Sequence, residues 1–233
     1  MSALLRAESL VRTLPLTVPV TLVHDISLEI ERGEFVVIMG PSGSGKSSLL
    51  YLLGLLDRPT SGRLWLDGLD TAGFDEDALA DVRLSRLGFV FQFHFLLAEF
   101  TVLDNVMLPM RRLGRLGGEA MRERALGLLG GLGLADQAGK RPDQLSGGQR
   151  QRVAVARALA NDPLVILADE PTGNLDSSSS ANVRQILRDL ASKQGKTIIA
   201  VTHDANFASA ADRCIGLVDG RVSPGWVPPG LPR

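Results

Sequence analysis

Short unbroken runs of apolar residues recur along the chain and predict buried strands. Such runs are typical of parallel strands that are covered on both faces. They lie at Phe35–Met39, Leu87–Phe91, Leu164–Ala168, Thr197–Val201 and Ile215–Val218, the last of which we expect to be the final strand. Over Leu4–Ile30, by contrast, apolar and polar residues alternate around Pro15 and Pro19, and Gly62–Asp67 repeats this pattern. The alternation predicts a small, mainly antiparallel sheet beside the parallel one.

Helical patterns occupy much of the remaining chain. Ser47–Leu56 is rich in leucine and directly follows a glycine-rich stretch, so it is expected to be a helix. Between about 101 and 160 the sequence changes to helical signals, with helices expected at Glu119–Leu129 and Gly147–Leu159. We interpret this region as a helical subdomain inserted into an α/β core.

The last third of the chain returns to the core pattern and then ends in prolines. Val183, Ile186, Leu187 and Leu190 recur at helical spacing, which indicates an amphipathic helix that starts near Ser177–Ser180. We expect these serines to cap the helix and to face solvent. The sequence thus predicts a single domain over residues 1–222, followed by an extended or disordered Pro-rich tail, 223–233.

Composition and charge favour an ordinary globular protein. Of the 233 residues, 45% are hydrophobic, which is enough for a substantial core. Basic residues number 25 and acidic residues 26, so no strong field favours nucleic acid, and no nucleic-acid partner is expected. Cys214 is the single cysteine, which fits a reducing compartment. No run approaches the roughly 20 apolar residues of a membrane helix. We therefore expect a cytoplasmic chain that reaches a membrane only through a partner.

A phosphate-binding pattern stands between the first buried run and the first predicted helix. It consists of a glycine, four variable residues and then Gly-Lys-Ser. A strand, glycine loop and helix in this order aim backbone N–H groups and a positive helix end at one point. Lys46 would contact the outer phosphates, and the Ser47 hydroxyl would be a magnesium ligand. An ordinary Gly-rich turn is the alternative, and the agreement of all these positions weighs against it. The candidate residues of this loop are Gly40, Pro41, Ser42, Gly43, Ser44, Gly45, Lys46, Ser47 and Ser48.

Polar residues follow three other predicted strands, at the sheet edge where ligands of parallel sheets bind. Asp169 suits a carboxylate that holds magnesium, and Glu170 suits a base that orients or deprotonates water. Two adjacent carboxylates at a buried strand end would be costly without a cation. Gln92 can bind magnesium and sense the γ-phosphate, and His203 can hydrogen-bond that phosphate. Singly, a polar loop residue and a satisfied core histidine are the alternatives. The candidate catalytic residues are Glu170, His203, Gln92 and Lys46, and the candidate magnesium ligands are Ser47, Gln92 and Asp169.

Five of the eight phenylalanines fall between Phe89 and Phe100. Phe89 and Phe91 lie within a predicted strand, so we expect them in the core. Phe93, Phe95 and Phe100 lie past its end, where such concentrated apolar surface favours a docking site.

The most specific segment is Leu145, Ser146, Gly147, Gly148 and Gln149, at the start of a predicted helix. With it, the chain resembles the ATP-binding cassette (ABC) ATPases, whose signature reads Leu-Ser-Gly-Gly-Gln. The resemblance implies a P-loop NTPase core with a mostly parallel sheet, a small antiparallel subdomain and an inserted helical subdomain. It also implies ATP and Mg²⁺ as ligands and a head-to-tail dimer with a second copy of the chain. Each ATP would lie between one phosphate loop and the partner's signature. Asp176 matches the loop that communicates between subunits.

Two longer stretches, 92–97 and 170–176, resemble the branch that includes lipoprotein-releasing (LolD), macrolide-exporting (MacB) and cell-division (FtsE) ATPases. That branch implies a peripheral subunit on the cytoplasmic face of the inner membrane. Its partner would be an integral membrane permease of the MacB/FtsX type, and its cargo lipoprotein, lipophilic or peptide. An importer ATPase, a soluble ABC ATPase and a non-transport regulator are the alternatives. One departure concerns the base, because Thr13 and Leu14 stand where the family usually has an aromatic residue that stacks on adenine.

Overall fold

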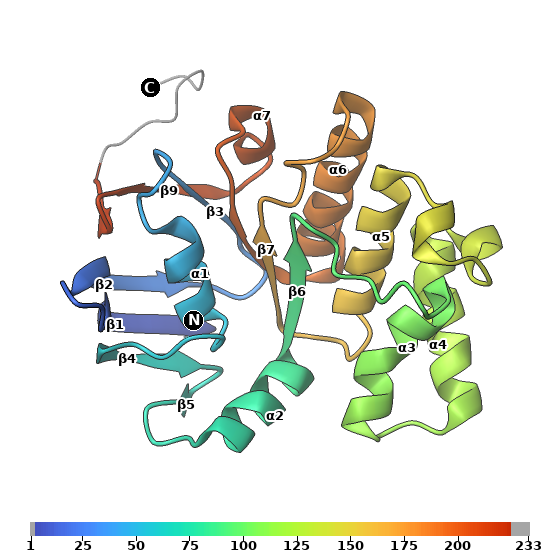
Figure 1. Cartoon of the computed structure of the whole chain (residues 1–233), viewed down its shortest axis with the longest axis horizontal. Helices are drawn as coiled ribbons and strands as arrows, with labels where there is room; N and C mark the ends of the chain where they lie inside the picture. The colour runs from blue at the N-terminus through green and yellow to red at the C-terminus, as the bar shows by residue number, and fades with distance from the viewer. Residues whose placement is uncertain (1–2, 225–233) are drawn as a thin grey trace.

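The computed structural model describes residues 3–224, which form two β-sheets and a group of helices arranged across the molecule (Figure 1). The antiparallel sheet has the strand order β2-β1-β4-β5, and the central sheet has the order β10-β9-β3-β8-β7-β6. The predicted α/β class, with a small antiparallel sheet beside a mostly parallel one, is confirmed. The Pro-rich tail is an expectation for residues 223–233, most of which lie outside the described residues.

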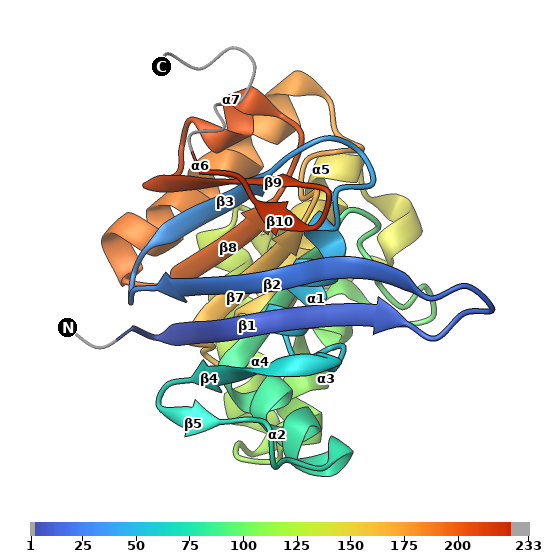
Figure 2. The ribbon, with the colours of Figure 1, turned by 90° about the vertical axis from the view of Figure 1, so that its left-hand side faces the viewer.

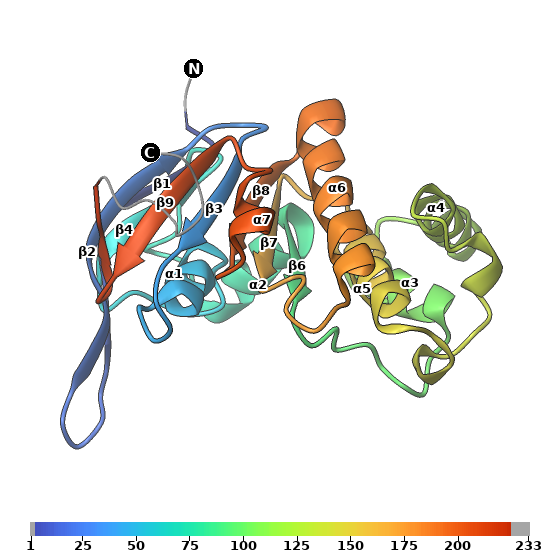
Figure 3. The ribbon, with the colours of Figure 1, turned by 90° about the horizontal axis from the view of Figure 1, so that it is seen from above.

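The antiparallel sheet forms from the alternating segments. Its strands are β1 (Leu5–Leu14), β2 (Val20–Ile30), β4 (Ser61–Leu66) and β5 (Leu69–Asp70). β1 and β2 pair from Leu5 opposite Ile30 to Leu14 opposite Val20. They make a long hairpin whose tip projects beyond the rest of the sheet (Figures 2 and 3). The predicted loop around Pro15 and Pro19 is this tip.

The central sheet forms from the apolar runs. Its strands are β3 (Phe35–Met39), β6 (Leu87–Phe91), β7 (Val165–Asp169), β8 (Thr197–Val201), β9 (Arg213–Val218) and β10 (Arg221–Val222). All adjacent pairs are parallel except β9 and β10. The expectation that Ile215–Val218 is the final strand was wrong. The chain turns back at Asp219 and Gly220, both with positive φ, and Val222 pairs with Leu217.

Both faces of the central sheet are covered, which explains its uninterrupted apolar runs. Val36 and Ile38 of β3 pack into a core shared with the antiparallel sheet and with α1 (Lys46–Leu53), which lies between the two sheets (Figure 3). Phe35 and Val37 pack on the opposite face. That face is covered by α5 (Gly147–Ala158), α6 (Ser177–Gln194) and α7 (Ala205–Ala208). Helix α1 ends before the predicted Leu56 because Leu55 adopts a left-handed backbone conformation, φ 58°.

The helical region contains an element that the sequence patterns did not identify. Helix α3 (Val102–Leu113) packs with α4 (Gly118–Gly131) and α5 around a separate apolar core. Pro109 lies inside α3 and obscured its helical pattern. Helix α2 (Glu76–Arg86) was also not predicted, because most of its residues are polar and only Leu79 and Val82 are buried. Within residues 3–224, no helix combines the length and the apolar content needed to span a bilayer.

Candidate active site

The predicted phosphate-binding loop connects β3 to α1. Gly45 precedes the helix with φ 91°, and a Cβ atom there would collide with the carbonyl oxygen of Leu22. Only glycine fits this position. The Nζ atom of Lys46 donates to the carbonyl oxygens of Gly40 and Pro41, at 3.0 and 2.8 Å. The loop encloses a hollow of about 350 Å³ whose lining residues are Leu22, Ser42, Gly43, Ser44, Gly45, Lys46, Ser47, Ser48 and Glu170.

Asp169 ends β7 beside the start of α1, and both of its carboxylate oxygens are engaged. Oδ1 accepts a hydrogen bond from the Ser47 hydroxyl at 3.0 Å, and Oδ2 accepts one from the Tyr51 hydroxyl at 2.9 Å. Burial, together with this bond and the carboxylate charge, raises the pKa of Tyr51 to about 12, so the phenol remains a donor. Sequence reasoning missed Tyr51. The available signal was its position four residues after Ser47, on the same face of a helix.

Glu170 follows Asp169 and has an unusual backbone conformation. Its φ is 44°, which is uncommon for a residue with a side chain and is often found at functional sites. Its backbone N–H donates to Val201 at 2.9 Å. Oε2 accepts from the Thr202 hydroxyl at 3.1 Å, and Oε1 lies 2.9 Å from Nδ1 of His203. The end of β8 therefore orients the carboxylate that lines the hollow.

These contacts change one expectation. We expected the adjacent carboxylates of Asp169 and Glu170 to need a cation at a buried strand end. Neither is fully buried, and each has two protein partners, so hydrogen bonds already compensate part of the desolvation cost.

Gln92 follows β6, the strand next to β7, and lies against the segment after Glu170. Its Nε2 atom donates to Oδ1 of Asn174 at 3.3 Å, and Gly173 allows the close approach. Phe91 of β6 pairs with Asp169 of β7. Gln92 and Glu170 are the next residues of these two strands, so both follow the same end of the sheet. The structure thus brings the polar strand ends to one edge of the sheet. Sequence reasoning did not identify Asn174 as a partner.

The Leu-Ser-Gly-Gly-Gln segment forms the N-terminus of α5 and is away from the chain's own phosphate hollow. The Ser146 hydroxyl accepts from the Gln149 backbone N–H at 3.2 Å, and Oε1 of Gln149 accepts from the Ser146 N–H at 2.9 Å. This is a reciprocal helix cap. Leu145 is buried in the helical core, and a Cβ atom at Gly148 would collide with Ser179. None of the residues 145–149 lines the hollow.

Asp176 is the N-cap of α6 and neighbours the start of α5. Its carboxylate accepts from the Ser178 hydroxyl at 2.6 Å and from the Ser179 backbone N–H and hydroxyl at 2.9 and 2.8 Å. These bonds hold the pKa of Asp176 well below its ordinary value, so the carboxylate stays ionised. The serines were expected to cap α6; the cap is Asp176, and two of the serines donate to it.

The oxygen atoms near the loop suit magnesium. Within the described part of the chain, no three His, Cys, Asp or Glu side chains form a metal-binding cluster. Magnesium bound to nucleotide needs only one or two protein oxygens, because phosphates and water complete its octahedron. The Ser47 hydroxyl and the Asp169 carboxylate, 3.0 Å apart, supply oxygens of this kind. Gln92 is at the same edge of the sheet.

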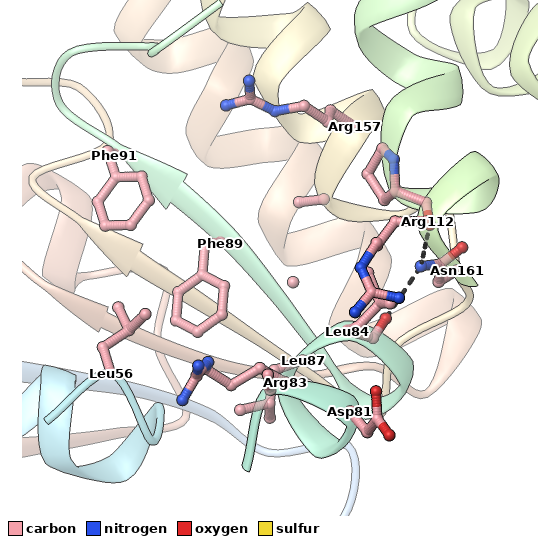
Figure 4. A pocket seen from close by; sticks show the side chains of 14 residues that line it. Leu56, Asp81, Arg83, Leu84, Leu87, Phe89, Phe91, Arg112, Arg157 and Asn161 are labelled. Atoms are coloured by element: carbon pink, nitrogen blue, oxygen red, sulfur yellow. Dashed lines mark hydrogen bonds between the residues drawn. The ribbon is translucent and has the colours of Figure 1, made fainter. Parts of the chain in front are cut away.

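A groove of about 390 Å³ lies away from the phosphate hollow, between α2, β6, α3 and α5 (Figure 4). Phe89 and Phe91 line it with stacked rings whose centroids are 5.9 Å apart. The prediction that both are core residues holds only in part: both are partly buried and form a groove wall, and Phe89 also packs against the core shared by the two sheets. Phe93 and Phe95 are each 63% exposed. The Phe95 ring contacts Phe91 edge-on at 5.5 Å, so the exposed aromatic surface continues from the groove.

Two side chains of α5 donate hydrogen bonds to the backbone at and just after the end of β6, beside this groove. Arg157 lines the groove and donates to the carbonyl oxygens of His94 and Phe95, both at 2.7 Å. Gln151, which is fully buried, donates to the carbonyl oxygen of Phe91 at 3.3 Å. The chain that follows β6 is therefore attached to the helix that begins with the Leu-Ser-Gly-Gly-Gln segment.

Comparisons with known proteins agree with this geometry. The ABC transporter family model matches residues 23–173. The lipoprotein-releasing system ATP-binding protein LolD 1 of Chlorobium chlorochromatii is 54% identical over 203 residues, which cover 87% of this chain and 82% of that protein. The macrolide export ATP-binding/permease protein MacB of Bartonella henselae is 50% identical over 221 residues, which cover 94% of this chain and 33% of that protein. A dimeric, post-hydrolysis structure of the ATP-binding cassette MJ0796 of Methanocaldococcus jannaschii, bound to ADP and Pi, superposes with a TM-score of 0.87. It is 43% identical, and the match covers 94% of this chain and 96% of that one.

Proposed function

This chain belongs to the ABC transporter family and is an ATPase of the LolD/MacB branch, and we propose that it powers a separate integral membrane permease of the MacB/FtsX type. The observation that carries the ATP-hydrolysing part of this proposal is the position of Glu170, which lines the same hollow as the phosphate-binding loop. A base at that point can act on a water molecule beside the terminal phosphate. ATP and Mg²⁺ are the ligands of this family.

Different residues of the chain would have different roles in binding and hydrolysis. The loop amides and Lys46 would hold the phosphates, and Ser47 and Asp169, with Gln92, would hold magnesium. When bound, magnesium neutralises charge that develops on the phosphate oxygens. Glu170 would take the proton of the attacking water. Thr202 and His203, which contact its two carboxylate oxygens, would keep it aimed at that water.

A second copy of the chain completes the site in this proposal. The hollow is lined by the phosphate-binding loop, but by none of the residues 145–149 of the same chain. These residues form a helix N-terminus, where Ser146 and backbone N–H groups favour an anion. In a head-to-tail dimer they would contact the γ-phosphate bound by the partner. Asp176, which lies beside them at the start of α6, would communicate between the two sites. ATP binding would close the dimer and product release would open it.

The permease would dock on the groove lined by Phe89 and Phe91 and on the exposed rings of Phe93, Phe95 and Phe100. A short cytoplasmic helix of the permease, with one apolar face, fits such a surface. The resulting complex would place the chain peripherally on the cytoplasmic face of the inner membrane. Extraction or export of a lipoprotein, lipophilic or peptide cargo is the role that we propose by similarity to LolD and MacB.

Purification of the tagged chain from membranes tests this proposal. We expect an integral membrane protein with MacB/FtsX-like sequence to co-purify and to change the rate of ATP hydrolysis. A Lys46→Ala variant is the matched control, because it should retain the permease but hydrolyse ATP at a much lower rate. Recovery of the chain with soluble partners alone, or a permease that leaves hydrolysis unchanged, would contradict the transport role.

A further inference from the structure

The Asp169 carboxylate is fixed from two sides by one helix. Ser47 lies in the first turn of α1 and Tyr51 lies about one turn later, and both hydroxyls contact the same strand end. Ser47 donates to Oδ1 at 3.0 Å and Tyr51 donates to Oδ2 at 2.9 Å. A carboxylate held at both oxygens has a single orientation. The Tyr51 hydroxyl is the group of α1 that holds Oδ2. By holding Oδ2 it helps to determine how Oδ1, the other oxygen of the same carboxylate, faces the phosphate-binding loop.

The chemistry of a phenol suits this position. A lysine or arginine here would form an ion pair with Asp169 and compete with a cation for the carboxylate. A phenol donates one hydrogen bond and adds no charge, so the full negative charge remains available to a metal ion. Tyr51 is the single tyrosine of the chain, and its ring also packs against the core shared by the two sheets. The ring thus anchors the hydroxyl at a fixed distance from the strand end.

We propose that Tyr51 is a positioning residue that orients the Asp169 carboxylate for the magnesium ion of the bound nucleotide. This inference rests on the proposed function, in which Ser47 and Asp169 hold that ion. Groups that hydrogen-bond to a metal-ligating carboxylate commonly change metal affinity by about 10- to 100-fold when they are removed. Loss of the Tyr51 hydroxyl should therefore weaken the contribution of magnesium to nucleotide binding and leave the phosphate contacts intact.

The Tyr51→Phe variant tests this, because it removes one oxygen atom and keeps the ring. The affinity of the full chain for a non-hydrolysable ATP analogue is measured in excess EDTA and in excess Mg²⁺. For the wild type, the ratio of the two dissociation constants gives the coupling between metal and nucleotide. In Tyr51→Phe we expect an unchanged affinity in EDTA and a coupling ratio reduced about 10-fold. Thr71→Val is the matched control, since it removes a buried hydroxyl that donates to the carbonyl of Leu64 in the other sheet.

Other outcomes distinguish a failure of the inference about Tyr51 from a failure of the proposed magnesium site at Asp169. An unchanged coupling ratio in folded Tyr51→Phe overturns the positioning role. Equal losses of affinity in EDTA and in Mg²⁺, together with a melting temperature lowered more than in Thr71→Val, also overturn it and indicate packing alone. Asp169→Asn checks the underlying site. If that variant keeps the full coupling ratio, Asp169 does not hold magnesium and the assignment under the proposed function is wrong. If it loses the ratio while Tyr51→Phe keeps it, only the inference about Tyr51 fails.

Discussion

The Nδ1 atom of His203 lies 2.9 Å from Oε1 of Glu170, although the two residues follow different strands of the central sheet. Thr202 contacts the other carboxylate oxygen at 3.1 Å. The residues that follow β8 thus hold the side chain of Glu170, which follows β7. Glu170 also has a positive φ. This contact between strand ends gives Glu170 a defined direction into the phosphate hollow, as a general base requires.

Replacement of Glu170 by Gln should abolish steady-state hydrolysis and preserve ATP binding. The amide has the same shape but cannot accept the proton, and loss of a general base lowers rates by about 10²- to 10⁴-fold. With ATP bound and not hydrolysed, the two chains should remain together. Sedimentation velocity with ATP and Mg²⁺ should then show a stable dimer. Glu119→Gln, at an exposed position of α4, is the control, and wild-type turnover by Glu170→Gln would refute the assignment.

Gln149 should contribute to stability through the helix cap. Its side chain accepts the Ser146 N–H, so Gln149→Ala should lower the free energy of unfolding by about 0.5–1.5 kcal/mol. Gln149→Glu keeps an acceptor at this position and should retain most of the stability. Denaturant titration measures both. If Gln149→Ala and Gln149→Glu are both as stable as the wild type but both lose ATP-dependent dimerisation, the Gln149 amide acts on the nucleotide and capping is not its main role.

The sequence was most informative where a motif and its flanking pattern impose one local structure. The phosphate-binding loop could be located because Gly45 must adopt a left-handed conformation between a buried strand and a helix. Asp169, Glu170 and His203 could be placed at one edge because parallel strands end on the same side of a sheet. Gln149 could be assigned to a helix start, but its cap with Ser146 required side-chain geometry.

The remaining features depend on contacts between segments that are distant in sequence. Tyr51 looks like an ordinary helical residue until β7 brings Asp169 beside it. Phe89 and Phe91 look like core residues of a buried strand, yet β6 is the edge strand of the central sheet, and α2, α3 and α5 leave a groove beside the face that carries both rings. Val90, on the opposite face of β6, is fully buried, so the cover of each face depends on which helices pack against it. No periodicity in the sequence distinguishes a partly covered strand face from a completely buried one.

Selectivity for ATP over GTP should be weak. Thr13 and Leu14 supply no aromatic ring, and no aromatic side chain is among the described residues that line the phosphate hollow. Base stacking on an aromatic residue contributes roughly 1–3 kcal/mol in nucleic-acid sites, so a ring could change affinity about tenfold or more. Dissociation constants for both nucleotides should be similar in the wild type, and Leu14→Tyr should strengthen ATP binding. A strong preference for ATP in the wild type that Leu14→Tyr does not alter would contradict this account.

Phe95 and Phe100 should anchor the permease and contribute little to the fold. Phe95 is 63% exposed and Phe100 37% exposed, whereas a core phenylalanine such as Phe35 is fully covered. Burying one phenylalanine contributes roughly 1.5–3 kcal/mol. If both rings are anchors, the variant with Phe95→Ser and Phe100→Ser should bind the permease weaker by orders of magnitude. Its melting temperature and basal hydrolysis should stay close to the wild type.

Retention by permease-containing membranes distinguishes docking from core packing for these two rings. The matched control replaces Leu16 and Val18 with Ser, because these apolar residues are 58% and 75% exposed at the tip of the β1–β2 hairpin, away from the groove. Docking predicts that the phenylalanine variant folds and hydrolyses ATP but is no longer retained, whereas the hairpin variant is. An unfolded phenylalanine variant would mean that the rings complete the cassette core. Normal retention would mean that the permease binds elsewhere, because the loss of two buried aromatic anchors would markedly weaken any complex that depends on them.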